Sequence, residues 1–385
     1  MLSCNQPAHF APGTFGYDLQ FLRQHDDSVI VLEQGTARVI VSPKYQAKVF
    51  TSTNVGDTGA SFGWIHYKAF EGPLDPHMNA YGGENRLWLG PEGGKFSLFF
   101  PPDAKMEFAN WKTPPAFDTE PWTVEAHSKD SVQLRKDMTL TNYAGTLLQL
   151  SVGREVKLLS SAEILSTYLN PPSVKVVGYE TINTLTNTGT TPWTETTGMP
   201  CLWLLDMFPP SQSTVIVIPY QESAGEHGTS PATTDYFGAI PPDRIRMDSS
   251  LLYFKADGKQ RGKLGIHSSR AVGMAASYDA KNQVLTVTQF DVDSSARYLN
   301  QEWNTTKPSF SGDAVNAYND GPLADGSQMG PFYELESVSP AAFLAPGQSQ
   351  VHRHRVYHFT GPEAGLDSIC KRMLAVPLEK VKNAF

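Results

Sequence analysis

The chain has 385 residues, of which 40% are apolar and 18% are charged, a composition that fits a folded protein with a large core and excludes a long disordered chain. Its formal charge of −8 is spread along the sequence, and the basic stretch from Arg353 to Arg355 is too short for a nucleic-acid surface, so we expect no nucleic-acid partner. No segment reaches the roughly 18 apolar residues that a spanning helix needs, and we therefore expect no membrane span.

The chain begins with Met1-Leu2-Ser3-Cys4, which resembles the end of a bacterial lipoprotein signal, where a small residue precedes the lipidated cysteine. If a precursor is trimmed there, Cys4 marks an exported protein that is periplasmic or lipid-anchored. The alternative is a chance cysteine in the terminus of a cytoplasmic bacterial protein. The three cysteines, Cys4, Cys201 and Cys370, are too few and too scattered for a disulfide framework or a zinc ribbon, so we expect free thiols.

Short runs rich in Val, Ile, Thr, Phe and Tyr recur along the chain, separated by Gly, Pro, Asn and Asp, and this spacing predicts an all-β sandwich or barrel. The predicted strands cover residues 28–33, 37–41, 47–52, 96–100, 131–136, 147–158, 174–186, 215–219, 272–278, 284–290 and 332–338. Helical signals are few. They comprise Phe15 to His25, a capping-box pattern that starts at Ser160, and the tail from Ala364, where Pro377 should break the helix.

These elements predict three parts: an N-terminal extension with a short helix over residues 1–27, one β-sandwich domain over 28–362, and a C-terminal helical tail over 363–385. The stretch 221–250 is long and rich in Gly and Pro, and it contains His227. Loops of this length inside a compact domain are uncommon and often functional.

The segment from Gly82 to Gly94 is a candidate binding loop. Its five glycines and one proline surround Glu84, Arg86 and Glu92, a tight backbone path that brings polar side chains close to a ligand. Arg86 can donate a planar fork to a carboxylate or to vicinal hydroxyls. The alternative is a bulged strand in which Arg86 pairs with Glu84 or Glu92. The Lys-Ser/Thr of a phosphate loop is missing, so nucleotide binding is not expected and no cofactor is assigned.

Other candidate ligand contacts lie beside glycines or in predicted loops, although a lone histidine is more often structural than catalytic, and tryptophans more often pack in a core or at its rim. They are His66, His77, Asn79, His227, Asn319 and Trp303, with Trp64, Trp88 and Trp111 as further aromatic faces on which a sugar ring could stack.

The predicted strand from Phe332 to Val338 places Glu334 and Glu336 on one face, about 6.6 Å apart by the strand rise. Two such carboxylates can divide into an acid and a base when charge and burial separate their pKa values. The alternative is a solvated strand face. Together with Glu84, Glu92 and Asp320 they offer oxygen ligands for calcium, but the sequence has no Asp-x-Asp-x-Asp loop, so no metal site is assigned.

Several segments resemble aldose 1-epimerases. The resemblance lies in Leu335-Glu336-Ser337 through Pro340, Leu344-Ala345-Pro346-Gly347, and His352 with Tyr357-His358-Phe359, and it extends to the hairpin-like run 29–53 and to Leu185-Thr186-Asn187-Thr188. In addition, Gly63-Trp64-Ile65, the segment 81–94 and the strand 332–336 look like an uncharacterised bacterial family of the same superfold. This resemblance implies a galactose-mutarotase-like sandwich with few short helices.

The resemblance also implies that Glu336 is the catalytic base, with Glu334 in reserve, and that His352 is structural. The family's histidine should follow the Thr-Asn turn, but residues 197–206 contain none. The replacement acid could be His66, His77, His227 or Glu334.

We therefore expect a carbohydrate-active protein, a divergent aldose 1-epimerase that acts on a sugar or a uronic acid. One alternative is a glycoside hydrolase, since the estimated carboxylate separation touches the lower edge of the inverting range of about 6.5–9.5 Å. The other alternative is a non-catalytic carbohydrate-binding module, which the missing histidine favours.

Overall fold

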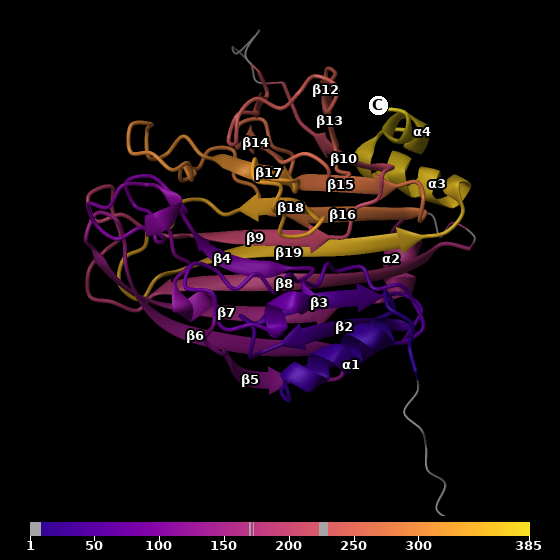
Figure 1. Cartoon of the computed structure of the whole chain (residues 1–385), viewed down its shortest axis with the longest axis horizontal. Coiled ribbons are helices and arrows are strands. Elements are labelled where there is room, and N and C mark those ends of the chain that lie inside the picture. Colours follow the sequence, from indigo (N-terminus) through magenta and orange to yellow (C-terminus); the bar gives the residue numbers. More distant parts are fainter. Residues whose placement is uncertain (1–8, 169–170, 172, 223–229) are drawn as a thin grey trace, which may run out of the picture.

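The computed structural model describes residues 9–168, 171, 173–222 and 230–385. Cys4 and His227 lie outside the described residues. Antiparallel strands arranged in three sheets are the main regular elements of the described chain, and the fold is the predicted galactose-mutarotase-like β-sandwich with few helices (Figure 1).

The largest sheet has ten strands and carries long β-strands through the middle of the molecule (Figure 1). In spatial order they are β12 (Ile245–Met247), β13 (Leu251–Lys255), β10 (Thr214–Pro219), β15 (Met274–Asp279), β16 (Val284–Phe290), β19 (Ser349–Thr360), β8 (Lys175–Asn187), β7 (Leu147–Leu158), β6 (Ser131–Thr141) and β5 (Thr123–His127). Near one edge of the sheet the strands alternate, since in β6 the buried Val132, Leu134, Met138 and Leu140 alternate with exposed or half-buried polar residues. Strands β10, β13 and β15 are instead buried along almost their whole length.

A six-stranded sheet packs against the large one and carries the candidate site. In spatial order it consists of β11 (Ala232–Thr233), β14 (Gly262–His267), β17 (Asp313–Asn319), β18 (Tyr333–Val338), β9 (Cys201–Phe208) and β4 (Arg86–Gly90). Every residue of β4, β9 and β18 is buried. These strands are therefore covered on both faces, on one by the large sheet and on the other by loops.

A three-stranded sheet, β1 (Ile30–Gln34), β2 (Ala37–Ser42) and β3 (Lys48–Thr53), lies beside the other two with helix α1 (Phe15–His25) against it (Figure 1). Phe15 and Leu22 of α1 pack on Ile40 and Phe50. The short helices are α2 (Ser161–Thr167), η1 (Tyr67–Phe70), η2 (Phe108–Asn110) and η3 (Pro115–Phe117). The Ser160 hydroxyl accepts a hydrogen bond from the Glu163 amide, so the predicted cap of α2 is present.

Two C-terminal helices cover the outer face of the ten-stranded sheet at its β13 to β15 end (Figure 1). Helix α3 spans Glu363–Leu374 and α4 spans Leu378–Lys382, with Pro377 between them as predicted. Leu366, Ile369 and Cys370 follow the spacing of one helical face and pack on the sheet. None of the described helices is long and apolar enough to cross a bilayer.

Buried polar groups join the sheets. Ser337 Oγ lies 2.8 Å from His354 Nδ1 and 2.9 Å from His352 Nε2, and His354 Nε2 lies 2.6 Å from Asp206 Oδ2. Burial and the neighbouring His354 lower the pKa of His352 to about 3, so His352 is neutral. All four side chains are fully buried, which fits a structural network between β18, β9 and β19.

Most predicted strands are present, with shifts of a few residues at their ends, but the strand predicted over residues 96–100 is wrong. Phe96, Phe99 and Phe100 are buried, yet their backbone forms bends and turns rather than a strand. The segment packs its aromatic rings into the core without pairing along a neighbouring strand. The aromatic content of this segment correctly indicated that its side chains are buried. The same content wrongly indicated that its backbone pairs with a neighbouring strand.

Candidate functional site

The two glutamates of β18 point to the face of the six-stranded sheet that is turned away from the ten-stranded sheet. Ser337 points inward to β19, and strand alternation therefore sends Glu336 and Glu334 to the opposite face. On that face they meet side chains from β4, β9 and β14. The predicted shared face of Glu334 and Glu336 is present, and it is not a solvated one, since both side chains are buried.

Glu336 is held by two donors. Lys263 Nζ of β14 lies 2.9 Å from Glu336 Oε2, and the Trp203 indole N–H of β9 donates to the same oxygen at 2.9 Å. The other oxygen, Oε1, is buried and has no hydrogen-bond partner among the described residues. A buried carboxylate oxygen without a partner is costly, and a ligand hydroxyl could donate to it.

Glu334 has a separate cation. Arg86 Nη2 of β4 donates to Glu334 Oε1 at 2.7 Å, and both side chains are 8% exposed. The Arg86 guanidinium also lies 4.7 Å from the centre of the Trp88 ring. Arg86 Nε and Trp88 Nε1 are buried donors without partners in the described part of the chain. The unpartnered donors of Arg86 and Trp88 and the unpartnered oxygen of Glu336 therefore lie on one face of the six-stranded sheet.

Glu92 is the third carboxylate near this point. It follows β4, and the Gln301 side chain accepts a hydrogen bond from its backbone amide at 3.1 Å. Burial raises the pKa of Glu92, the Lys263 charge and the indoles of Trp303 and Trp111 lower it, and the Glu336 charge raises it. Glu92, Glu334, Glu336, Arg86 and Lys263 are called the carboxylate cluster below.

Burial and mutual repulsion separate the protonation states within the carboxylate cluster. Burial raises the pKa of Glu334 to about 7, because desolvation and the Glu336 charge outweigh the effect of Arg86. The pKa of Lys263 is raised despite burial, because Glu336, Glu92 and Glu334 all favour its charged form. Near neutral pH the cluster therefore contains a permanently charged lysine beside Glu336 and a carboxyl at Glu334 that can hold a proton.

Aromatic rings surround the cluster. The Trp88 and Trp203 ring centres are 5.7 Å apart at an interplanar angle of 78°, and Lys263 Nζ lies 4.9 Å from the Trp203 ring centre. On the Glu92 side the Trp111 and Trp303 rings are nearly parallel, with centres 6.0 Å apart. Rings and buried polar groups together are typical of a site that binds an amphipathic ligand such as a sugar.

The structure corrects the prediction that Glu84 and Asn319 line this site. Glu84 Oε1 lies 3.0 Å from His358 Nε2 between the sheets and accepts from Ser52 at 2.7 Å. The alternation that would put Glu84 beside Arg86 does not apply, because the backbone before β4 pairs with β3 instead. Asn319 ends β17, where its side chain holds a turn through Gly258 and Gln260.

The predicted histidines do not contact the two glutamates of β18. His66 Nδ1 lies 3.0 Å from the Ala80 carbonyl, and its ring stacks on Trp64. His77 Nδ1 lies 2.6 Å from the Trp111 carbonyl, and its ring stacks on Phe108. His227 lies outside the described residues. Among the described candidates for the missing acid, Glu334 alone belongs to the cluster.

Asn79 and Trp303 take different places. The Asn79 amide donates to the buried Asp118 at 2.7 Å, whereas Trp303 lies beside Glu92. Sequence reasoning missed Lys263 and Trp203, although both bond Glu336 directly. Trp203 lies within residues 197–206, where the family's histidine was expected and is absent. The tryptophan in that segment was the signal that could have identified it as a site residue. The sequence around Lys263 gave no such signal, because Lys263 comes near Glu336 only through the pairing register of β14 on β17.

No group of three or more His, Cys, Asp or Glu side chains in the described part of the chain is arranged to hold a metal ion. The five acidic residues considered for calcium are therefore not gathered into such a group: Glu84 and Asp320 bond elsewhere, Asp320 to Gln328. The carboxylates of the cluster have lysine and arginine as counter-charges instead.

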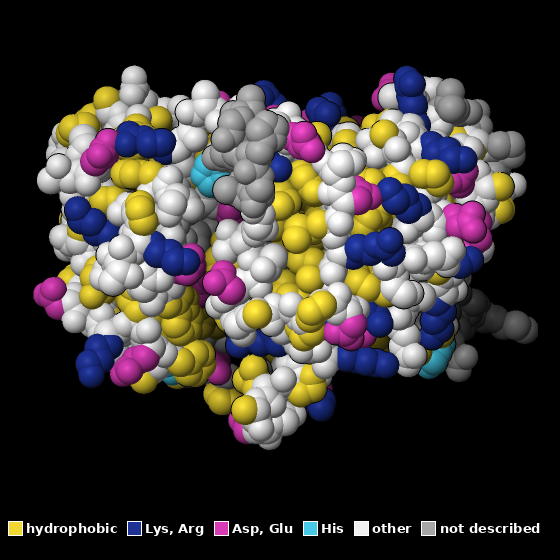
Figure 2. Space-filling view, turned by 90° about the horizontal axis from the view of Figure 1, so that it is seen from above, with side chains coloured by type: hydrophobic (Ala, Val, Ile, Leu, Met, Phe, Trp, Pro, Cys, Tyr) yellow, Lys and Arg dark blue, Asp and Glu magenta, His cyan; other side chains and the backbone are white. Residues whose placement is uncertain are grey.

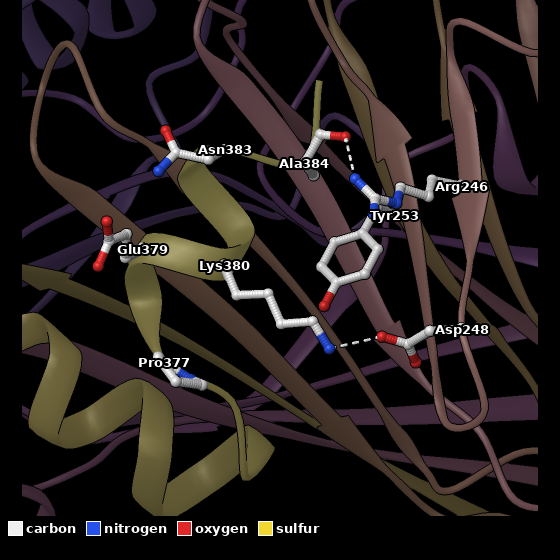
Figure 3. Close-up of a pocket in the computed structure, with 8 residues that line it drawn as sticks. All are labelled: Arg246, Asp248, Tyr253, Pro377, Glu379, Lys380, Asn383 and Ala384. Atoms are coloured by element: carbon white, nitrogen blue, oxygen red, sulfur yellow. Dashed lines mark hydrogen bonds and ion pairs between the residues drawn. The ribbon is translucent and has the colours of Figure 1, made fainter.

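A solvent-accessible pocket of about 560 Å³ lies far from the cluster, between α4 and strands β12 and β13 (Figure 3). Lys380 pairs with Asp248 there, and Arg246 reaches the Ala384 carbonyl. The charges of Lys380 and Asp248 are partnered within the pocket walls, whereas the buried Tyr253 hydroxyl there has no hydrogen-bond partner among the described residues. On the face seen in Figure 2, charged side chains of both signs are interspersed with hydrophobic ones, and neither sign dominates.

Comparison with known proteins supports the fold. A model described as a family of unknown function (DUF6786) matches residues 13–385. A galactose mutarotase-like protein from Lactobacillus casei has a TM-score of 0.50 at 11% identity over 86% of this chain and 99% of its own. A protein from Escherichia coli K12, provisionally described as an aldose 1-epimerase, has a TM-score of 0.49 at 13% identity over 86% and 98%. No curated protein matches the sequence.

Proposed function

The chain belongs to a family of unknown function (DUF6786), and from this premise we propose that it is a carbohydrate-active enzyme that interconverts the anomers of a sugar, a divergent aldose 1-epimerase. Its fold is that of galactose mutarotase-like proteins, but fold alone does not specify a reaction. The proposal therefore rests on the carboxylate cluster.

One observation carries the proposal: Glu334 and Glu336 share a face of β18 but have different surroundings. Glu336 has a lysine and an indole donor on one oxygen and a free acceptor on the other. Glu334 has a pKa of about 7 because it is buried. Two carboxyls whose environments separate their protonation states can act as base and acid at one substrate.

In the proposed reaction, the free Oε1 of Glu336 accepts the proton of the anomeric hydroxyl. The protonated Glu334 donates its proton to the ring oxygen, and the bond between the anomeric carbon and the ring oxygen breaks to give the open-chain aldehyde. Rotation about the adjacent C–C bond exposes the other face, and the reverse transfers close the ring. Both carboxyls regain their starting states, so no further reactant is needed.

A sugar-binding module is the second candidate, because each glutamate already has a cation and no described histidine contacts them. Such a protein would use the same rings and hydrogen-bonding groups without transferring protons. Hydrolysis of a glycosidic bond is a third outcome, which a separate incubation with an oligosaccharide detects, since it would release reducing ends from the oligosaccharide and leave free monosaccharides unchanged.

NMR exchange spectroscopy between the α and β anomer signals of a panel of free sugars tests the proposal. We expect the protein to speed exchange for at least one sugar and the Glu336→Gln variant to lose this effect while still binding. Glu125→Gln, on the fully exposed strand β5, is the matched control and should keep full activity. Binding without exchange would assign a binding module, and no binding by any sugar would overturn the proposal.

A further inference from the structure

The stretch 221–250, which the sequence marked as a functional loop, places one side chain beside the carboxylate cluster. Tyr236 follows β11, the edge strand that pairs with β14. Its ring centre lies 5.8 Å from Lys263 Nζ, and the Trp203 ring centre lies 4.9 Å from the same nitrogen. Because Glu336 Oε2 is 2.9 Å away, the ammonium has one carboxylate oxygen and two aromatic rings around it.

The Tyr236 ring is held in place through its hydroxyl group. The hydroxyl donates to Asp313 Oδ2 at 2.5 Å, and the Asn316 side-chain amide donates to the hydroxyl oxygen at 3.4 Å. Both partners lie over Gly265, where an added Cβ atom would be 2.0 Å from Asp313 Oδ2 and 2.6 Å from Asn316 Nδ2. This close approach requires a glycine. Asn316 is also directly opposite Glu336 in the pairing of β17 with β18, so the anchor of Tyr236 adjoins the proposed base.

The two rings restrict the position of the Lys263 ammonium. Among the described residues, Glu336 is the only hydrogen-bond acceptor of Lys263 Nζ, which has further N–H donors to offer. Aromatic faces attract an ammonium group, and the attraction strengthens where water is excluded. Since Trp203 and Tyr236 occupy the space around it, the ammonium stays on Oε2. The other oxygen of Glu336, Oε1, is thereby left without a partner.

We propose that Tyr236 is a positioning residue, whose ring holds the Lys263 ammonium on Oε2 of Glu336 and so keeps Oε1 free for the substrate. This inference rests on the proposed function, in which Oε1 accepts the proton of the anomeric hydroxyl. Tyr236 acts through Lys263 and does not touch the sugar. Without the ring, water or the ammonium itself would reach Oε1. A hydrogen bond there favours the charged form of the carboxylate and makes Glu336 a weaker base.

Steady-state kinetics of anomer exchange test this proposal with three variants, Tyr236→Leu, Tyr236→Phe and Phe237→Leu. Tyr236→Leu should lower kcat at least about tenfold and leave KM within about twofold, because positioning affects the proton transfer and not sugar binding. Tyr236→Phe keeps the ring and should retain kcat within about threefold. Phe237→Leu is the matched control, since Phe237 is exposed and its ring centre lies 3.8 Å from the Arg261 guanidinium instead. Its kcat should stay within about twofold of the unaltered value.

A measurement on the lysine itself is independent of catalysis. In protein with 15N-labelled lysine, the Lys263 ammonium should give an NMR signal whose hydrogens exchange slowly with water, because the side chain is only 12% exposed. Lys371, which is 54% exposed, is the internal reference for fast exchange. Tyr236→Leu should speed the exchange of the Lys263 hydrogens, whereas Tyr236→Phe should leave it slow.

Unchanged kcat in a folded Tyr236→Leu variant would overturn this inference and leave the proposed function intact. An equal loss of kcat in Phe237→Leu or in Tyr236→Phe would also overturn it, because the effect would not then come from the ring beside Lys263. Exchange at Lys263 as fast as at Lys371 in the unaltered protein would overturn it even if Tyr236→Leu does not fold. If the unaltered protein speeds anomer exchange of no sugar, the proposed function fails and takes this inference with it.

Discussion

The ammonium of Lys263 lies 2.9 Å from Glu336 Oε2 although a whole strand, β17, separates β14 from β18. On the other side, Arg86 reaches from β4 across β9 to Glu334. The two ion pairs approach β18 from opposite directions and span five neighbouring strands. The groups that would handle a ligand are therefore also groups that tie the sheet together.

Replacement of Lys263 by Met should destabilise the protein strongly, because it leaves the fully buried Glu336 without its cation. We expect a loss of about 3–5 kcal/mol in the free energy of unfolding, measured by urea denaturation. Lys371→Met removes the exposed pair with Asp367 and should cost no more than about 0.5 kcal/mol. If the double variant Lys263→Met/Glu336→Gln does not recover part of the loss, uncompensated charge is not the cause.

The hydrogen bond from Trp203 to Glu336 can be isolated with a matched pair of variants. Trp203→Phe removes the indole N–H that donates at 2.9 Å, whereas Trp122→Phe truncates an equally buried tryptophan whose N–H has no partner in the described structure. Both variants lose packing. Trp203→Phe should cost about 1.5–3 kcal/mol more, as expected for a bond to a charged acceptor. Equal costs for the two variants would contradict this.

Activity should fall as the pH rises through about 7, because the proposed acid, Glu334, has its pKa there and must be protonated to donate. The same shift has a consequence for stability. Since burial raises this pKa from its usual 4.5, the folded state binds the proton more tightly, and its contribution to stability is lost as the pH rises from about 4.5 to 7.

A kcat/KM profile and urea midpoints between pH 4 and 9 measure both effects. Glu334→Gln should lower kcat, remove the alkaline fall and flatten the dependence of stability over this range. A fall at pH 7 that persists in Glu334→Gln would assign the titration to another group.

The chain Ser337, His354 and Asp206 has the residue types of a hydrolytic triad, but all three are fully buried and lie on the inner face of the sheet. We expect Ser337→Ala to leave anomer exchange within about twofold of the unaltered rate. Asp206→Asn should lower the free energy of unfolding by about 1–3 kcal/mol, because it disturbs a buried hydrogen bond to His354. Reaction of Ser337 with a fluorophosphonate probe would contradict the structural role.

The sequence predicted elements well where a strand carries a clear local pattern. β7 and β16 have the predicted bounds, because alternating or continuous apolar runs end there at polar or turn residues. β14 was not predicted, since Gly262-Lys263-Leu264-Gly265 contains two glycines and only one apolar residue. Its position is set by pairing with β17, a contact between segments about fifty residues apart.

Only those features of the site that follow from a local sequence pattern could be predicted. The period of two placed Glu334 and Glu336 together, and the glycine-rich segment drew attention to Arg86. The side chains that bond Glu334 and Glu336 come from other strands, so the identity of these partners depends on the pairing register of the strands. Glu84 shows the opposite error. It lies two residues before Arg86, a spacing that puts two side chains on one face of a continuous strand, but here the backbone changes from one sheet to another between them.

Removing the Arg86–Glu334 and Lys263–Glu336 pairs from water carries a desolvation cost that well-packed apolar side chains would avoid. Simultaneous replacement of all four by Leu or Met should then be neutral or stabilising, while any sugar chemistry disappears. Laboratory evolution for heat resistance alone would tend to erase these charges. Evolution under selection for turnover would keep them at the expense of the melting temperature.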